Sequence, residues 1–218
     1  MPASLPVVAA PAIKVRLLGY EGFEASDRFL LGLKQEIWVS RWKAYPKIRT
    51  HRPKGIDTPE RMQAELAKPS MVTVVSAHAG RDAAGRLSFC GKEPGPVLPV
   101  DRLARPGGLG AASMVLIDAC WFEALAAALE PCAQPGSLVV GVKTDDLVTR
   151  GRDSVSVLGA VIRELCYLSD GDLSIAAVRH AISSVNTQTK ARNRAEHVRV
   201  SGTEEEPELR PLIGWYPD

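Results

Sequence analysis

The sequence predicts an α/β fold in which a mainly parallel sheet carries helices on both faces. Runs of apolar, largely β-branched residues at 71–76, 113–117 and 137–142 are typical of strands buried inside such a sheet. A strong helix former, residues 121–130, separates the second run from the third. Strands that alternate with helices are joined by crossover connections, which make neighbouring strands parallel. The chain of 218 residues is long enough to bury the core of one such domain.

The first part of the chain supplies further elements in the same alternating order. Residues 13–18 alternate apolar and basic side chains and predict a first strand. Apolar residues near helical spacing predict a helix over 27–39, and a short strand is expected within 46–51. A helix is expected over 59–68, because Thr58 is a good cap and a proline stands at the first helical position.

The remaining segments complete the predicted order of elements. Residues 81–110 are rich in Gly and Pro, with a hairpin expected around Gly85. Apolar residues on one helical face predict a helix that begins at 153 or 154 and reaches 165. Another helix is expected over 173–185.

One domain with short flanking segments is the predicted organisation. We expect residues 1–12 to form an N-terminal arm, residues 13–200 the domain, and residues 201–218 a polar tail that packs on the domain or extends it. The apolar start contains three prolines and no basic region ahead of its apolar run, which argues against a signal peptide. No run approaches the ~18 consecutive apolar residues of a membrane span. We therefore expect a cytoplasmic protein that does not bind a membrane.

Composition excludes several classes of protein and site. The formal charge of +2 is small and the basic residues are scattered, so nucleic acid is not expected as a direct partner. The four cysteines show no CxxC spacing, which argues against a zinc site and against a disulfide framework. We expect neither a metal nor an organic cofactor.

Polar and reactive residues follow two of the predicted buried strands. His78 and Gly80 come after the strand 71–76, and Asp118 and Cys120 come after the strand 113–117. Reactive groups of open α/β sheets lie just beyond the carboxyl ends of the central strands. If these two strands are neighbours, an imidazole stands beside a thiol at that edge of the sheet.

This combination has the chemistry of nucleophilic catalysis. Cys120 precedes the predicted helix 121–130, whose free N–H groups and dipole favour a thiolate. His78 is able to take up and return a proton near neutral pH. The backbone N–H groups of Gly80 and Cys120 are candidates for an oxyanion hole. The alternative is structural, with Cys120 as a core residue and His78 as a hydrogen-bonded loop residue.

Two motifs resemble the caspase-like clan of cysteine peptidases. SAHAG (76–80) closes one buried strand and LIDAC (116–120) closes the next, as a His-Gly-type motif and a Cys motif do in that clan. His78 lies 42 residues before Cys120, and the caspase spacing is about 50. DAC is similar to the clostripain and metacaspase branches, and SLVVGVKTDD (137–146) resembles a strand and acidic loop of bacterial CHAT-type peptidases.

This resemblance implies a fold, an activity and a site. The implied fold is a caspase-haemoglobinase-like three-layer sandwich, and the implied activity is that of a thiol protease, a hydrolase with a His78–Cys120 dyad. Two departures stand out, because Ala79 directly follows the histidine where glycine is common, and bulky Trp121 and Phe122 follow the cysteine. The resemblance covers residues 13–185, which is most of the chain.

The resemblance also implies a substrate preference. Asp118 stands two residues before Cys120, where related basic-specific enzymes carry an acidic residue that binds the side chain before the cut. Asp145 and Asp146 are candidates to join this pocket, and a carboxylate there pairs with Arg or Lys. The alternatives are that Asp118 caps a helix or holds a loop, and that the other two are solvated charges.

The expected partners follow from the same resemblance. A cysteine endopeptidase acts on a protein substrate, and a small free-standing one requires a regulatory or activating protein. CHAT-type domains serve as effectors in bacterial signalling or defence assemblies. Two other functions stay open at this point: a catalytically silent interaction module of the same fold, and a hydrolase of a small amide or ester.

Overall fold

The computed structural model describes residues 13–20, 25–90, 98–103, 112–120, 122–129, 132, 137–142, 151–188 and 195–199. The expected arm, residues 1–12, and the expected tail, residues 201–218, lie outside these residues, so the division of the chain stays a prediction. No helix of the described part is long and apolar enough to cross a membrane.

The centre of the fold is a mainly parallel sheet. Within the described residues it has six strands in the order β2-β1-β3-β7-β8-β9. The first five strands in this order are parallel, and β9 runs antiparallel to β8. The strands are β1 (Ile13–Gly19), β2 (Ile48–His51), β3 (Val72–Ser76), β7 (Met114–Asp118), β8 (Leu138–Val142) and β9 (Ala195–Arg199).

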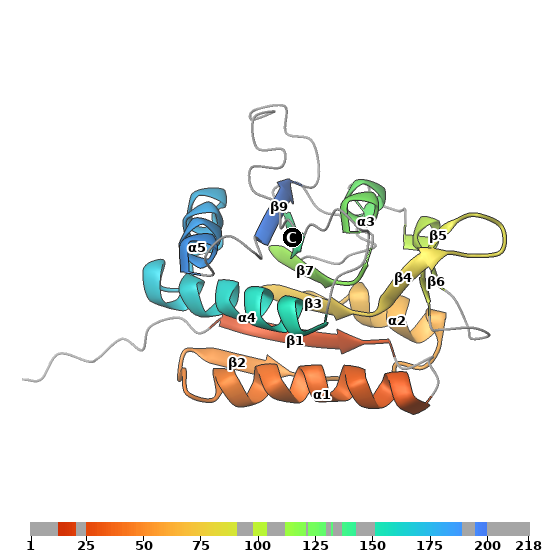
Figure 1. Cartoon of the computed structure of the whole chain (residues 1–218), viewed down its shortest axis with the longest axis horizontal. Helices are drawn as coiled ribbons and strands as arrows, with labels where there is room; N and C mark the ends of the chain where they lie inside the picture. Colours follow the sequence, from red (N-terminus) through yellow and green to blue (C-terminus); the bar gives the residue numbers. More distant parts are fainter. Residues whose placement is uncertain are drawn as a thin grey trace, which may run out of the picture.

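Helices cover both faces of this sheet. Figure 1 shows α4 in front of the central strands and α1 alongside β2 at the bottom of the view, while α2 lies behind the strands. One face packs against α1 (Ala25–Trp42), α4 (Gly151–Leu168) and α5 (Ile175–Gln188), and the other against α2 (Pro59–Leu66) and α3 (Phe122–Leu129). The predicted α/β class, a parallel sheet between two helical layers, is confirmed.

The alternating direction of side chains along each strand explains why the sheet has a core cluster on each of its two faces. Val72 and Val74 in β3 belong to one core cluster, whereas Val75 belongs to the other, because successive side chains of a strand point to opposite faces. The first cluster contains the stacked rings of Trp38 and Trp42, whose centroids lie 6.1 Å apart. A strand buried on both faces needs apolar residues at nearly every position, which is why the three strong strands were recognisable in the sequence.

A second, smaller sheet follows β3 and corrects one expectation. SAHAG (76–80) was expected only to close the buried strand, but His78 begins a further strand. Asp82 accepts backbone hydrogen bonds from Ala84 (2.9 Å) and Arg86 (2.8 Å), and Gly85 has φ +77°, so the chain reverses here as predicted. The elements are β4 (His78–Arg81), β5 (Leu87–Cys90), β6 (Leu98–Pro99) and the 3₁₀-helix η1 (Val100–Leu103), with β4-β5-β6 antiparallel.

Other boundaries are close to their predictions, with two differences. The cap of α2 is confirmed, because the Thr58 hydroxyl accepts a hydrogen bond from the Arg61 backbone N–H at 3.2 Å. α4 begins at Gly151, slightly earlier than expected. β9 was not predicted, since its residues AEHVR lack a buried-strand pattern and it pairs on one side only, with β8.

An ion pair on the second face ties α2 to the sheet. Arg16 in β1 is 8% exposed and donates to the backbone oxygens of Glu65 (3.0 Å) and Lys68 (3.2 Å), and it also pairs with the Glu65 carboxylate. Burial by itself raises the pKa of Glu65. The hydrogen bond and charge of Lys68, with the charge of Arg16, outweigh burial and hold this pKa below its ordinary value.

We expect Glu65→Gln to lower stability at neutral pH and to do so less at acid pH. A carboxyl whose pKa is lowered by folding stabilises the protein above its unfolded pKa, about 4.3, and this contribution is lost as pH falls through the folded pKa. The measurement is the free energy of urea unfolding of both proteins between pH 7 and pH 3. A difference that stays constant over this range would contradict the assignment.

Candidate active site

The register of two strands brings the predicted catalytic residues to one edge of the sheet. β3 and β7 are adjacent and parallel, with Ser76 opposite Asp118. The Ala77 N–H then donates to the Asp118 carbonyl oxygen at 3.2 Å, which keeps the two chains together past the last strand pair. His78 lies two residues after Ser76, and Cys120 lies two residues after Asp118. The condition for an imidazole beside a thiol, adjacency of the two strands, is therefore met.

His78 is exposed, and Cys120 is partly exposed. His78 is exposed and stands opposite Cys90 at the start of β4. Cys120 is a free thiol of intermediate exposure, two residues before α3 begins at Phe122. The unpaired backbone N–H groups at the start of a helix favour negative charge next to them. The edge thus has a partly exposed cysteine, an exposed histidine and a helix start.

The two buried cysteines differ from Cys120 in solvent exposure, which a nucleophilic thiol needs in order to reach its substrate. Cys132 and Cys166 lie in the core, as predicted. Burial raises the pKa of Cys166 to about 11, so its thiol stays protonated. Cys132 donates to the Ala128 carbonyl oxygen at 3.7 Å.

Gly80, the candidate oxyanion donor, lies on the same strand as His78. It stands opposite Ser88 of β5, two residues after His78, so the two residues share one side of β4. Ala79, between them, packs against the second core cluster. The glycine therefore presents no side chain on the side where His78 lies. Its role in an oxyanion hole stays a prediction.

Asp118 is buried and has a partner that the sequence analysis did not identify. It is 2% exposed, and Lys34 of α1 donates a hydrogen bond to its Oδ1 at 2.8 Å and lies 2.7 Å from its Oδ2. A sequence signal for Lys34 existed, because it stands one helical turn before Trp38, and Trp38 stands one turn before Trp42, inside the buried stripe of α1. A lysine at such a position requires a buried acceptor.

Two further polar residues lie at this edge. Ser76 is fully buried, and its Oγ has no hydrogen-bond partner among the described residues. The Tyr20 N–H donates to the Ser76 carbonyl oxygen at 3.1 Å. Burial, with the charges of Glu60 and Asp57, raises the pKa of Tyr20 to about 12, so this phenol stays neutral. Asp145, Asp146 and Trp121 lie outside the described residues.

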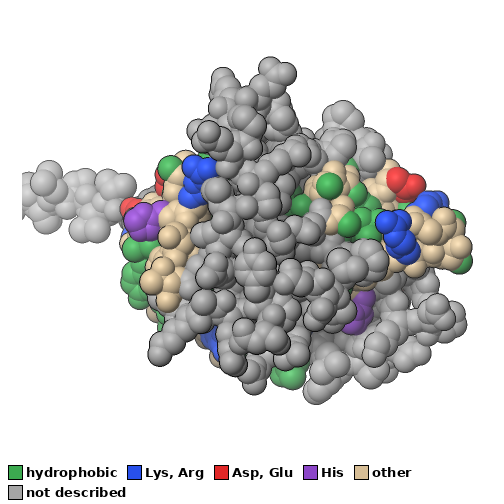
Figure 2. Space-filling view, turned by 45° about the horizontal axis from the view of Figure 1, so that its top comes forward, with side chains coloured by type: hydrophobic (Ala, Val, Ile, Leu, Met, Phe, Trp, Pro, Cys, Tyr) green, Lys and Arg blue, Asp and Glu red, His purple; other side chains and the backbone are tan. Residues whose placement is uncertain are grey.

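Metal ligands do not mark another site among the described residues. No group of three or more His, Cys, Asp or Glu residues there is arranged to hold a metal ion. Figure 2 shows basic side chains in small groups, with acidic and apolar side chains nearby, on the part of this face that is described.

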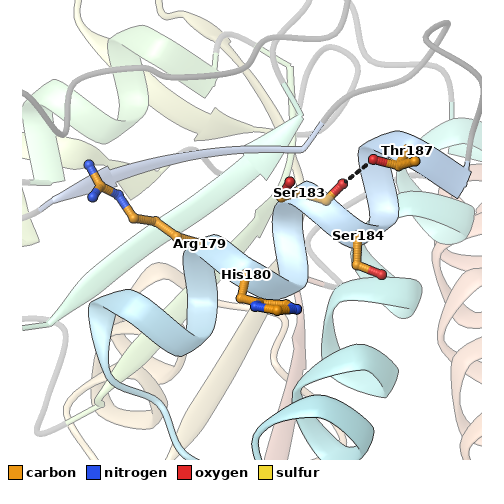
Figure 3. Close-up of a pocket in the computed structure, with 5 residues that line it drawn as sticks. All are labelled: Arg179, His180, Ser183, Ser184 and Thr187. Carbon is orange, nitrogen blue, oxygen red and sulfur yellow. Dashed lines mark hydrogen bonds between the residues drawn. The ribbon is translucent and has the colours of Figure 1, made fainter.

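A hollow of about 560 Å³ lies along α5 and is a weaker candidate site. Figure 1 places α5 toward the end of the sheet away from β4. The side chains in Figure 3 spread around one helix, and two already have partners: Ser184 donates to Glu164 Oε2 (3.1 Å) and Thr187 donates to the Ser183 carbonyl oxygen (2.9 Å). We give more weight to the sheet edge, where the adjacent strands β3 and β7 end and lead into His78 and Cys120. The hollow is lined by Arg179, His180, Ser183, Ser184 and Thr187.

Comparison with known proteins gives a likeness to solved structures but none to a family model or a curated sequence. No family model and no curated protein sequence matches the chain. Among solved structures, the chain is similar to the Arg-specific cysteine proteinase gingipain R, with 11% identity and a TM-score of 0.43. The match covers 81% of this chain and 42% of that one, so the chain spans less than half the length of the gingipain structure. At this identity and TM-score, the likeness assigns neither a substrate nor a mechanism to this chain.

Proposed function

We propose that this chain is a cysteine endopeptidase of the caspase-haemoglobinase type with a His78–Cys120 dyad. The observation that carries the proposal is the register of β3 and β7, in which Ser76 lies opposite Asp118. His78 and Cys120 each stand two residues after this pair. Their exposure supports it, since a nucleophile and its base must reach a substrate. The resemblance of SAHAG and LIDAC to the caspase-like clan agrees with this arrangement.

The chemistry proceeds in two steps. His78 takes the thiol proton of Cys120, and the sulfur attacks the scissile carbonyl carbon to form a tetrahedral oxyanion. The N–H groups of Gly80 and Cys120 stabilise that charge, and each such donor is typically worth ~10²–10³ in rate. The C–N bond breaks as His78 returns the proton to the leaving amine, which leaves a thioester. Water, with its proton taken by His78, hydrolyses the thioester and restores the thiol.

The proposed substrate is a protein cut after Arg or Lys. Asp118 supplies the negative charge for this preference, and Asp145 and Asp146 are candidates to add to it. A regulatory or activating protein partner, and a role as effector in a bacterial signalling or defence assembly, belong to the same proposal. They rest on the resemblance to CHAT-type peptidases. No metal or organic cofactor takes part in this chemistry.

A peptidyl-Arg acyloxymethyl ketone probe tests the proposal directly. We expect it to label the wild type, to lose all labelling in Cys120→Ala, and to retain it in the matched control Cys166→Ala, whose thiol is buried and protonated. Intact mass spectrometry reads out the labelling. A peptidyl-Asp probe, run in parallel, is expected to leave the protein unlabelled.

Three other outcomes have distinct meanings. Labelling by the Asp probe alone would keep the peptidase and overturn the role of Asp118 in substrate choice. The absence of labelling by either probe, with candidate partners present, would overturn the peptidase and favour an interaction module. Cleavage of a small amide or ester without cleavage of any protein would favour the small-molecule hydrolase.

A further inference from the structure

Lys34 forms an ion pair with Asp118, the carboxylate that the proposed function assigns to substrate binding. Its ammonium reaches Asp118 from α1, with contacts of 2.8 Å to Oδ1 and 2.7 Å to Oδ2. The Asp118 side chain is 2% exposed, whereas that of Lys34 is 24% exposed. The lysine side chain is therefore partly exposed to solvent, whereas the carboxylate that it contacts is buried.

The surroundings of this pair contain a buried hydroxyl group without a hydrogen-bond partner among the described residues. Ser76 lies opposite Asp118 in the register, so the two side chains share the α1 face of the sheet. Its Oγ is buried and lacks a hydrogen-bond partner among the described residues. A buried polar atom in that state is unfavourable, and a ligand that brings an extra N–H relieves it.

Arginine and lysine differ in what they offer at such a spot. A lysine side chain from a substrate brings the same ammonium that Lys34 already provides, so it gains nothing by replacing Lys34. A guanidinium presents five donors in a planar fork, enough for both oxygens of Asp118 and for the Ser76 hydroxyl. Lys34 is also tethered, and a tethered group competes at an effective concentration of roughly millimolar.

We propose that Lys34 is a specificity-determining residue: a tethered competitor that occupies the basic-residue pocket at Asp118 and makes it select arginine over lysine. The inference rests on the proposed function, because it takes Asp118 as the receptor for the residue before the cut. When arginine enters, the Lys34 ammonium moves out to solvent, where water solvates it. When lysine arrives, Lys34 keeps its place.

Binding of two small cations tests this without any catalytic step. Benzamidine carries a planar amidinium and benzylamine carries an ammonium on the same ring. Calorimetry in the Cys120→Ala background is expected to give benzamidine binding at least about tenfold tighter than benzylamine binding. Lys34→Gln, which keeps a hydrogen-bond donor and removes the charge, is expected to tighten benzylamine binding about tenfold and to narrow the ratio. Adding Asp118→Asn to Lys34→Gln is expected to abolish both the tighter benzylamine binding and the narrower affinity ratio.

Every result of this experiment decides the inference. Equal affinities in wild type and Lys34→Gln, or no binding of either cation by any variant, overturn it. If Lys34→Gln does not fold, Lys34→Arg retains the charge and is expected to weaken benzamidine binding about tenfold, because its fork competes better. Unchanged affinity in Lys34→Arg overturns the inference as well.

The proposed function fails in a different way. If the probe does not label Cys120 while substitution of Lys34 still changes the affinity for the cations, the dyad is overturned and cation binding at Asp118 stands. Labelling that requires Cys120, with cation binding indifferent to Lys34, would leave the peptidase and overturn the role of Lys34.

Discussion

Cys120→Ala is expected to abolish turnover of a peptidyl-Arg amide, with a loss of kcat/KM of at least about 10⁴-fold. Removal of a covalent nucleophile eliminates the acyl-enzyme route, and only transition-state binding by the remaining groups is left. His78→Ala is expected to lose about 10²–10⁴-fold, the usual contribution of a positioned general base. Release of a fluorescent amine under single-turnover conditions measures both losses.

The pH profile separates a catalytic role of His78 from a structural one. Without the imidazole, the thiol must ionise unaided, so the residual rate of His78→Ala is expected to rise steadily toward alkaline pH. The wild-type profile is expected to have a different shape, because there the imidazole takes the thiol proton. A profile of His78→Ala with the wild-type shape would contradict the assignment, whatever the size of the rate loss.

Thermal and chemical unfolding provide controls for these variants. His78 is exposed and Cys120 is half-buried, so neither substitution removes a large buried side chain. We expect their free energies of unfolding to stay close to that of the wild type, within about 1 kcal/mol. A loss of activity with unchanged stability is then attributable to the chemistry.

Leu116→Ala is expected to have the largest effect on stability, a loss of about 2–5 kcal/mol. Leu116 lies in β7 at the centre of the sheet, has no exposed surface, and belongs to the core cluster under α1, α4 and α5. Truncation removes its apolar contacts and leaves a cavity that strands paired on both sides cannot easily fill. The free energy and m-value of urea unfolding give the measurement.

Leu168→Ala is the matched control for that substitution. Leu168 is at the end of α4 and is 47% exposed, so the same chemical change there is expected to alter stability by no more than about 0.5 kcal/mol. Similar losses in both variants would contradict the position of β7 in the core. Because β7 also carries Asp118 and leads into Cys120, Leu116→Ala is expected to lower activity together with stability.

The ion pair of Lys34 with Asp118 also clarifies the earlier alternatives for this carboxylate. Asp118 was considered as a pocket residue, a helix cap or the anchor of a loop. Its described partner is the side chain of a helix on the face of α1, α4 and α5, whereas α3 packs on the opposite face. Its part in substrate binding stays a prediction, and the cation-binding experiment tests it.

The sequence by itself determined the class of the fold and the order of its main elements. Strands buried on both faces, such as β3 and β7, need nearly continuous apolar runs, and those runs are visible without any tertiary information. The cap and proline at the start of α2 are local interactions for the same reason. His78 and Cys120 were recognisable as candidates because each follows such a run.

Only the tertiary structure decided what depends on contacts between distant segments. The adjacency of β3 and β7, the antiparallel β9, and the continuation of His78 into β4 follow from strand pairing, which leaves little trace in one strand's own residues. The same holds for Lys34, which stands 84 positions from Asp118 in the chain. A charged residue in a buried helical stripe signals that an acceptor exists, but only the packing of α1 against the sheet selects Asp118 as the carboxylate that it meets.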